Sequence, residues 1–170
     1  ALFNDGFKFD GVWVWSDLAY KNSTYFSTET YRKILYPHHK RLFGFFEKHC
    51  LPVIFHCDGN CKAFIPLLLK AGIRALNPLE IDCGFSDAEL LKKEYGKELV
   101  LFGNMPTAVL EKSPLSGAGK KEIEEVFKKR LEILKTGGGF IYHSDNPIPE
   151  TVSLENYQFA LNMVKQYGRY

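Results

Sequence analysis

The pentapeptide His56-Cys57-Asp58-Gly59-Asn60 holds the residue types best suited to chemistry in this sequence of 170 residues. Side chains alternate along a strand, so His56 and Asp58 project to one side and Cys57 to the other. An imidazole beside a carboxylate suits a metal ion or an acid–base pair. Gly59 permits a sharp turn that brings backbone N–H groups towards a ligand, and we expect Asn60 to contact it. The structural alternative is a His–Asp pair that caps the next helix.

Polar residues also follow the other short apolar runs of the sequence. These residues are Asp17, Glu80, Asn104, His143 and Asp145. By the same alternation, His143 and Asp145 share one face. Asp17 follows Trp13 and Trp15, and a pocket lined by that face would offer indole walls to an aromatic or macrocyclic ligand. We expect Trp13 in the core and Trp15 in the pocket.

The four cysteines, Cys50, Cys57, Cys61 and Cys83, make an even count. In a core-rich chain of this length they need not form a disulfide frame, so free thiols in a cytoplasmic protein are expected. Zinc bound by His56, Cys61 and Cys83 is the alternative. The spacing of the cysteines differs from that of a zinc ribbon or finger.

The overall composition excludes several classes of protein. The chain has 22 Lys+Arg against 20 Asp+Glu and is 45% hydrophobic. A near-neutral balance without a basic run argues against binding to nucleic acid or to a membrane surface through bulk charge. No apolar stretch reaches the roughly 18–20 residues of a membrane span, and no leader is visible at Ala1. We expect one cytoplasmic domain with a sizeable core.

Short apolar runs alternate with helical patterns along the chain. The runs predict strands buried on both faces at residues 12–15, 52–56, 73–76, 99–102 and 139–143. The helical patterns span residues 28–50, 61–71, 86–95, 120–135 and 153–167. Pro37 should kink or split the first helix, a capping box from Ser86 should open the third, and residues 117–119 should form a loop.

Five alternations of strand and helix indicate the α/β class with a parallel sheet, either open or closed into a barrel. No glycine-rich phosphate loop follows a strand, which disfavours the nucleotide-binding versions. In a barrel, the chemistry takes place at the carboxyl ends of the strands. The polar residues that follow the apolar runs would lie at that rim.

Several motifs together resemble the uroporphyrinogen decarboxylase superfamily, which includes the decarboxylase of haem biosynthesis and the cobalamin-linked methyltransferases. The motifs lie at residues 17–20, 31–37, 56–60, 71–80, 103–104, 137–145 and 153–157. The resemblance covers essentially all of residues 1–170 and corresponds to the carboxyl-terminal part of the family's domain. It implies a (β/α)8 barrel of the TIM type, of which this chain supplies about the last five βα units. The missing amino-terminal half of the barrel would come from an unseen segment or a partner.

The resemblance also implies roles for individual residues. In the decarboxylase, a Ser after the first of these strands and a His after the last line the porphyrinogen pocket; Ser16 matches the former, and Asp145 stands at the latter with His143 two residues earlier. In the methyltransferases, zinc lies on an H-x-C pair and a further Cys, which correspond to His56, Asp58 and Asp145. The candidate metal ligands are thus His56, Asp58, Glu80 and Asp145. Asp17, Asp58, His143 and Asp145 would be catalytic, and Trp15, Ser16, Gly59, Asn60 and Asn104 would bind substrate.

The leading hypothesis is a methyltransferase-like enzyme that moves a methyl group from a small methoxylated or methylated substrate to a corrinoid protein. An ether is a poor leaving group, so its oxygen must be protonated or bound by a metal such as zinc. The alternatives are uroporphyrinogen decarboxylation, which needs no cofactor in the family, and a non-catalytic fragment or binding module. A homodimer is a further expectation.

Overall fold

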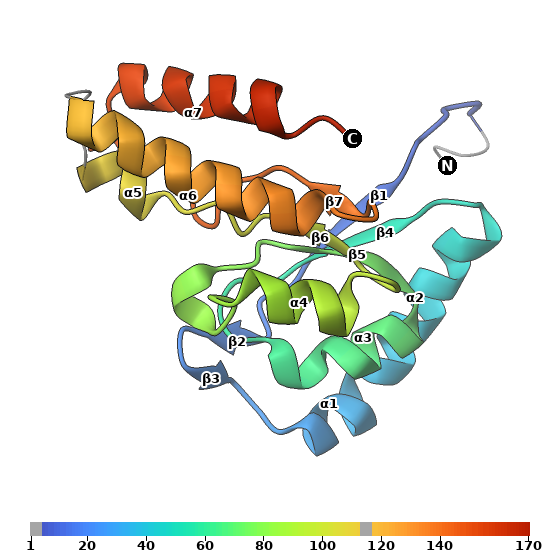
Figure 1. The fold of residues 1–170 in the computed structure, drawn as a ribbon. Helices are drawn as coiled ribbons and strands as arrows, with labels where there is room; N and C mark the ends of the chain where they lie inside the picture. The colour runs from blue at the N-terminus through green and yellow to red at the C-terminus, as the bar shows by residue number, and fades with distance from the viewer. Residues whose placement is uncertain (1–4, 113–116) are drawn as a thin grey trace. The chain divides into compact units, whose positions relative to one another are not determined.

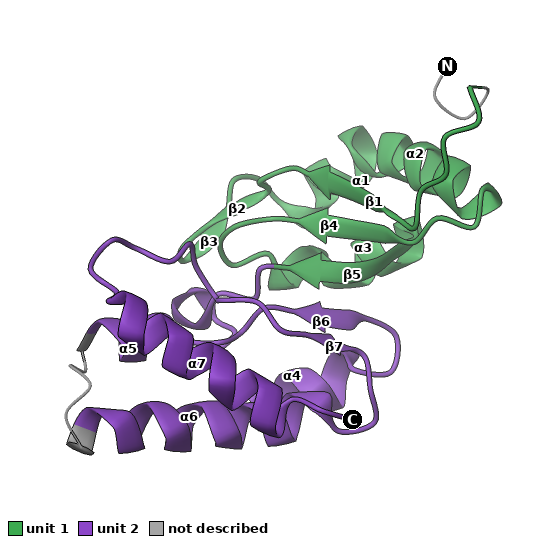
Figure 2. Cartoon of the chain, turned by 90° about the horizontal axis from the view of Figure 1, so that it is seen from above, with its two compact units in different colours: residues 1–77 green, residues 78–170 purple. Residues whose placement is uncertain are grey.

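A computed structural model describes residues 5–112 and 117–170 of the chain. The chain divides into two compact units, residues 1–77 and residues 78–170 (Figure 2). Within the described residues, no helix combines the length and the apolar character that crossing a membrane requires.

Unit 1 is built on three parallel strands, β1 (Val12–Trp15), β4 (Val53–His56) and β5 (Ile73–Asn77). A short antiparallel hairpin, β2 (Ala19–Tyr20) with β3 (Ser23–Thr24), follows β1. The register sets the last residue of β1 opposite the last residue of β4, and the last residue of β4 opposite the last residue of β5. Side chains from three separate segments therefore meet at the carboxyl end of this sheet.

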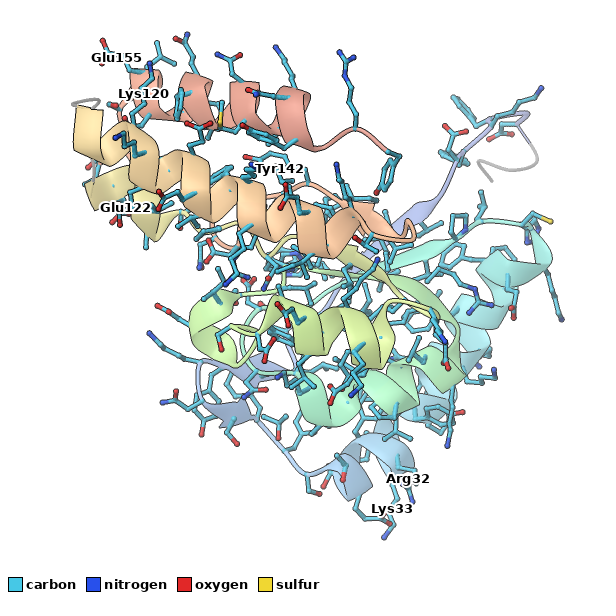
Figure 3. All side chains as sticks on the ribbon, in the orientation of Figure 1. Arg32, Lys33, Lys120, Glu122, Tyr142 and Glu155 are labelled. Carbon is cyan, nitrogen blue, oxygen red and sulfur yellow. The ribbon has the colours of Figure 1, made fainter. Side chains whose placement is uncertain are left out.

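The helices of unit 1 lie together on one side of its sheet (Figure 2). They are α1 (Thr28–Ile34), α2 (Tyr36–Lys48), the 3-10 turn η1 (Lys62–Phe64) and α3 (Ile65–Ala71). Pro37 splits the first predicted helix, since it occupies the first turn of α2, where its missing N–H is tolerated. Beneath the helices, Phe43 of α2 packs edge-on against Phe55 of β4, and both side chains are fully buried. On the outer side of α1, Arg32 and Lys33 project away and pair with Glu29 (Figure 3).

The opposite face of β1 is open within unit 1. Trp13 is 49% exposed and Trp15 71% exposed. The expectation that β1 is buried on both faces, with Trp13 in the core, is therefore wrong. The reason is that α1–α3 all lie on the other side of the sheet (Figure 2), where they cover Phe55 and leave the indole face of β1 uncovered.

Unit 2 pairs β6 (Val100–Phe102) with β7 (Phe140–Ile141) in parallel. Its helices are η2 (Ile81–Cys83), α4 (Ala88–Tyr95), α5 (Ala108–Lys112), α6 (Gly117–Lys135) and α7 (Leu154–Tyr167). The long helices α6 and α7 lie alongside each other (Figure 1). Since α6 begins at Gly117, the loop predicted at residues 117–119 is wrong. Tyr142 lies next to α7 (Figure 3), where burial, with Tyr157 nearby, raises its pKa to about 12.

Each of the five parallel strands is followed along the chain by a helix. This order confirms the α/β class. The helix ends also agree with the local signals: Gly72 ends α3 with φ +122°, a conformation that suits glycine, and Ser153 caps α7 by accepting a hydrogen bond from the Asn156 amide.

The start of α4 differs from the prediction by one residue. The cap is Asp87, whose carboxylate accepts from the Leu90 amide at 2.9 Å, and not Ser86. Asp87→Ala should therefore lower the free energy of unfolding by about 1 kcal/mol, while Ser86→Ala should leave it nearly unchanged. Urea unfolding followed by circular dichroism measures both variants. A larger loss in Ser86→Ala than in Asp87→Ala would contradict the assignment.

Candidate functional site

Three potential metal-ligating side chains converge at the carboxyl end of the unit 1 sheet. Asp17 follows β1, His56 ends β4, and Asp58 lies two residues beyond it. One ligand atom from each lies within 4.8 Å of the other two. His56 Nε2 is 3.4 Å from Asp58 Oδ1. Sequence analysis named all three residues, and the structure brings them together.

The backbone of this region restrains the carboxylate of Asp17. The ladder between β1 and β4 continues past the strands, because the Ser16 amide donates to the His56 carbonyl at 3.0 Å. The Asp58 amide then donates to Asp17 Oδ1 at 3.0 Å. This bond points the Asp17 carboxylate across the strand pair towards the next loop. Ser16 thus has a defined backbone role, and its predicted contact with a substrate stays a prediction.

Asn77, the last residue of β5, orients the imidazole. His56 Nδ1 lies 2.9 Å from Asn77 Oδ1. An amide oxygen only accepts hydrogen bonds, so Nδ1 donates to Asn77, and Nε2 on the other side of the ring faces Asp58. Asn77 is almost completely buried, which makes this orientation firm. Histidines that bind metals typically donate their second ring N–H in this way.

The donor set fits a divalent cation. Two carboxylates and one imidazole nitrogen are ligands that zinc accepts at about 2.0–2.2 Å, and around a tetrahedral ion two such ligand atoms would lie about 3.4 Å apart. The ligand atoms of Asp17, His56 and Asp58 lie within 4.8 Å of one another, so small side-chain movements would bring all three onto one ion. Asp58 and Asp17 are exposed, which leaves room for such movements and for a ligand from solution.

The indoles of β1 flank the same imidazole. The ring of Trp15 meets that of His56 edge-on at 5.8 Å, and the ring of Trp13 lies at 6.2 Å with a tilt of 33°. Trp13 and Trp15 lie on the same face of β1, four and two residues before Asp17 in the alternation of side chains. The structure therefore places Trp15 beside the three convergent side chains and adds Trp13 to the same surface, while the substrate contact of Trp15 stays a prediction.

The loop after β4 turns on Gly59. Its φ is +81°, and a Cβ atom at this position would lie 2.7 Å from the carbonyl carbon and oxygen of Tyr20. The Asn60 amide donates to that same carbonyl at 3.0 Å. The predicted sharp turn is confirmed, but the close approach that it permits is to the hairpin of β2 and β3. Substrate contacts by Gly59 and Asn60 stay predictions.

The cysteines contribute no side chain to the group formed by Asp17, His56 and Asp58. All four are free thiols, and Cys57 is fully buried on the face opposite His56 and Asp58, as the strand alternation predicts. A hydrogen bond from Cys61 lowers the pKa of Cys57 against the effect of burial, and the amide of Leu18 also donates to its Sγ. Among the described residues, the grouping of potential ligands contains no cysteine, so the structure does not support the alternative cysteine-rich zinc site.

The remaining predicted residues belong to unit 2. Glu80 precedes η2 and accepts from the Cys83 thiol at 3.3 Å. His143 Nδ1 donates to the Ser144 carbonyl at 2.7 Å, and its ring stands edge-on to Phe102. Their roles as metal ligand and catalytic residue stay predictions.

Asp145 and Asn104 are both buried in unit 2. One oxygen of Asp145 accepts from the amide of Thr107 at 2.9 Å and from its hydroxyl at 3.0 Å. The amide group of Asn104 donates to the carbonyls of Leu79 and Phe85. Both side chains are thus engaged by loops of their own unit, and their contacts with a ligand or metal stay predictions.

Sequence reasoning assigned no role to Asn77 or Thr107. The signal for Asn77 was available, since it is a polar residue at the end of an otherwise apolar strand next to β4. Thr107 lies 38 residues from its partner, a separation at which periodicity carries no information about contact.

Comparisons with known proteins agree with this architecture. The sequence matches the family described as uroporphyrinogen decarboxylase (URO-D) over residues 12–167. Among curated proteins, none matches. Among solved structures, a methyltransferase from Methanosarcina mazei is similar, with 18% sequence identity and a TM-score of 0.66; the likeness covers 94% of this chain and 43% of the other. The predicted fold class, an α/β fold that matches part of a (β/α)8 barrel, is confirmed, and this chain belongs to the uroporphyrinogen decarboxylase family.

Proposed function

We propose that this protein is a metal-dependent methyltransferase that takes a methyl group from a small methoxylated aromatic compound and passes it to a corrinoid protein. The observation that carries the proposal is the convergence of Asp17, His56 and Asp58 beside two exposed indoles. The similarity to a methyltransferase supports the choice of reaction within the family. The chain spans 43% of that structure, so the activity is proposed for the whole protein.

Asp17, His56 and Asp58 would hold a divalent cation such as zinc. When bound, the ion would supply a Lewis acid for the methyl-bearing oxygen of the substrate. The residues themselves prepare the site before any ligand arrives. The hydrogen bond between Nδ1 and Asn77 fixes the direction in which Nε2 points, and the Asp58 amide donates to the Asp17 carboxylate and so restrains it.

The indoles explain why an aromatic substrate is favoured. Trp15 is 71% exposed and stands edge-on to His56, so one of its faces is open to a ring from solution. Stacking on an indole adds roughly 0.5–1.5 kcal/mol beyond the burial of area. A flat aromatic ring on Trp15 would bring a substituent on that ring close to the carboxylates of Asp17 and Asp58.

The direct test is methyl transfer from a dimethoxybenzoate to free cob(I)alamin, which stands in for a corrinoid protein and reports by its visible absorbance. Zinc-loaded protein should show turnover. Trp15→Ala should raise KM about tenfold with a smaller effect on kcat, since a stacking contact is made before and during the reaction. Tyr25→Ala is the matched control, because Tyr25 is similarly exposed and lies beyond the β2–β3 hairpin.

Two results would contradict the proposal. One is the absence of transfer by zinc-loaded protein with methoxylated and methylated donors alike. The other is the formation of coproporphyrinogen from uroporphyrinogen at a substantial rate, which would assign the chain to the decarboxylase reaction of its family instead.

A further inference from the structure

Two separate loops of unit 2 are joined by the side chain of Asn104. This residue follows β6, has φ +64° and is fully buried. Its Nδ2 donates to the carbonyl of Leu79 at 2.9 Å and to that of Phe85 at 2.6 Å. One amide group therefore spans the two ends of the segment that carries Glu80 and η2.

Arg130 of α6 determines which way that amide points. Its Nη1 donates to Asn104 Oδ1 and, at 3.5 Å, to the Asn104 carbonyl. Its Nη2 donates to the Ser86 carbonyl at 3.0 Å. With the oxygen of the amide held by the guanidinium, the nitrogen must face the two backbone carbonyls. The planar guanidinium of Arg130 thus contacts Asn104 in the loop after β6 and, at the same time, Ser86 in the segment before α4.

The charge of Arg130 also has neighbours that balance it. Burial lowers the pKa of its guanidinium, and the negative charges of Asp145 and Asp87 oppose this shift. Asp145 is in turn held by Thr107 in the loop after β6. Arg130 therefore lies at the junction of three loops, which carry Glu80, Asn104 and Asp145.

We infer that Arg130 is a positioning residue that sets the geometry of the two loops of unit 2 that carry Glu80 and Asn104. Its importance for catalysis rests on the proposed function, because the loops carry residues predicted to act there. In the sequence, Arg130 ends the run Lys128-Lys129-Arg130, which suggests three charges in contact with solvent. Lys129 is exposed, whereas Arg130 is half-buried. Arginine is required because a lysine ammonium is a single point of charge, whereas the guanidinium is a rigid fork with several donors.

Backbone hydrogen exchange tests the inference in the intact chain. In Arg130→Met, which keeps an unbranched stem, amides of residues 79–86 and 103–107 should exchange on the order of tenfold faster, while those of α2 and β4 should be unchanged. The matched control is Lys129→Met, which removes the neighbouring charge and should change neither loop. Unchanged exchange in both loops, or an equal effect from Lys129→Met, would overturn the inference.

A second variant distinguishes the effect of the guanidinium donors from the effects of side-chain packing and charge. Arg130→Lys keeps the stem and the charge, so a merely structural role predicts wild-type behaviour. We expect the side-chain amide resonances of Asn104 to shift in its NMR spectrum and the amides of residues 79–86 to exchange faster than in wild type. Wild-type resonances and exchange in Arg130→Lys, or uniform loosening of the whole chain in both variants, would overturn the inference. These measurements use neither metal nor substrate, so their failure is distinguishable from a failure of the proposed function.

Discussion

Replacing His56 with alanine is expected to abolish zinc binding. Protein incubated with zinc sulfate and then desalted should retain about one zinc per chain, and His56→Ala should retain less than about a tenth of that, because two exposed carboxylates alone bind zinc weakly. Inductively coupled plasma mass spectrometry measures the ratio. His38→Ala serves as the matched control, since His38 is an exposed histidine of α2 and its loss should leave the ratio unchanged.

Substitutions of Asn77 should affect zinc binding less than the loss of His56 does. Asn77→Ala removes the acceptor of the His56 Nδ1 proton and should weaken zinc binding by about 10–100-fold, the usual effect of losing such a partner. Asn77→Asp retains an acceptor oxygen and should bind at least as tightly as wild type. Competition with a chromophoric chelator measures the affinities. Zinc content that is equal in wild type and His56→Ala would remove the metal from the proposal.

Gly59→Ala should destabilise the chain by about 3 kcal/mol. A residue with a Cβ is disfavoured at φ +81° by roughly 1–2 kcal/mol, and here the Cβ would also lie 2.7 Å from the Tyr20 carbonyl. The atoms that this Cβ would meet belong to the backbone of the hairpin, which cannot rotate away. Relief would therefore shift the loop that carries Asp58.

Gly137→Ala is the control for the backbone conformation alone. Gly137 has φ +73°, but within the described part of the chain nothing beyond its two sequence neighbours lies within 4 Å of where its Cβ would be. This variant should lose only about 1 kcal/mol. Urea unfolding followed by circular dichroism compares the two. Equal losses would show that the approach to Tyr20 contributes nothing, and the close packing of the hairpin on Gly59 would be refuted.

The predictions for His56→Ala and Gly59→Ala concern the same loop of unit 1, the one that follows β4. His56 and Asp58 would hold the proposed metal ion, while Gly59 allows the chain to turn directly after them. The Asn60 amide then bonds to Tyr20, and so the loop is tied to the hairpin that follows Asp17. We therefore expect Gly59→Ala to change both the stability of the chain and its metal binding. His56→Ala should change metal binding alone.

The sequence by itself determined the five parallel strands, most of the helices and their order, but not the β2–β3 hairpin or α5. Pro37 divides α1 from α2, Gly72 ends α3 and Ser153 caps α7, because these effects act over a few residues of backbone. Strand alternation also placed His56 and Asp58 on one face and Cys57 on the other. The likeness of several short motifs to one family then gave the fold class, which the match over residues 12–167 confirmed.

Only the tertiary structure decided which of these residues meet. The pairing of His56 with Asn77 depends on the register between β4 and β5, and Arg130 reaches Asn104 only because α6 folds back across 26 residues of chain. The exposure of Trp13 likewise follows from the side of the sheet on which the helices pack. Local propensity is insensitive to such choices, since they are made by packing and hydrogen bonding between segments that are distant in the chain.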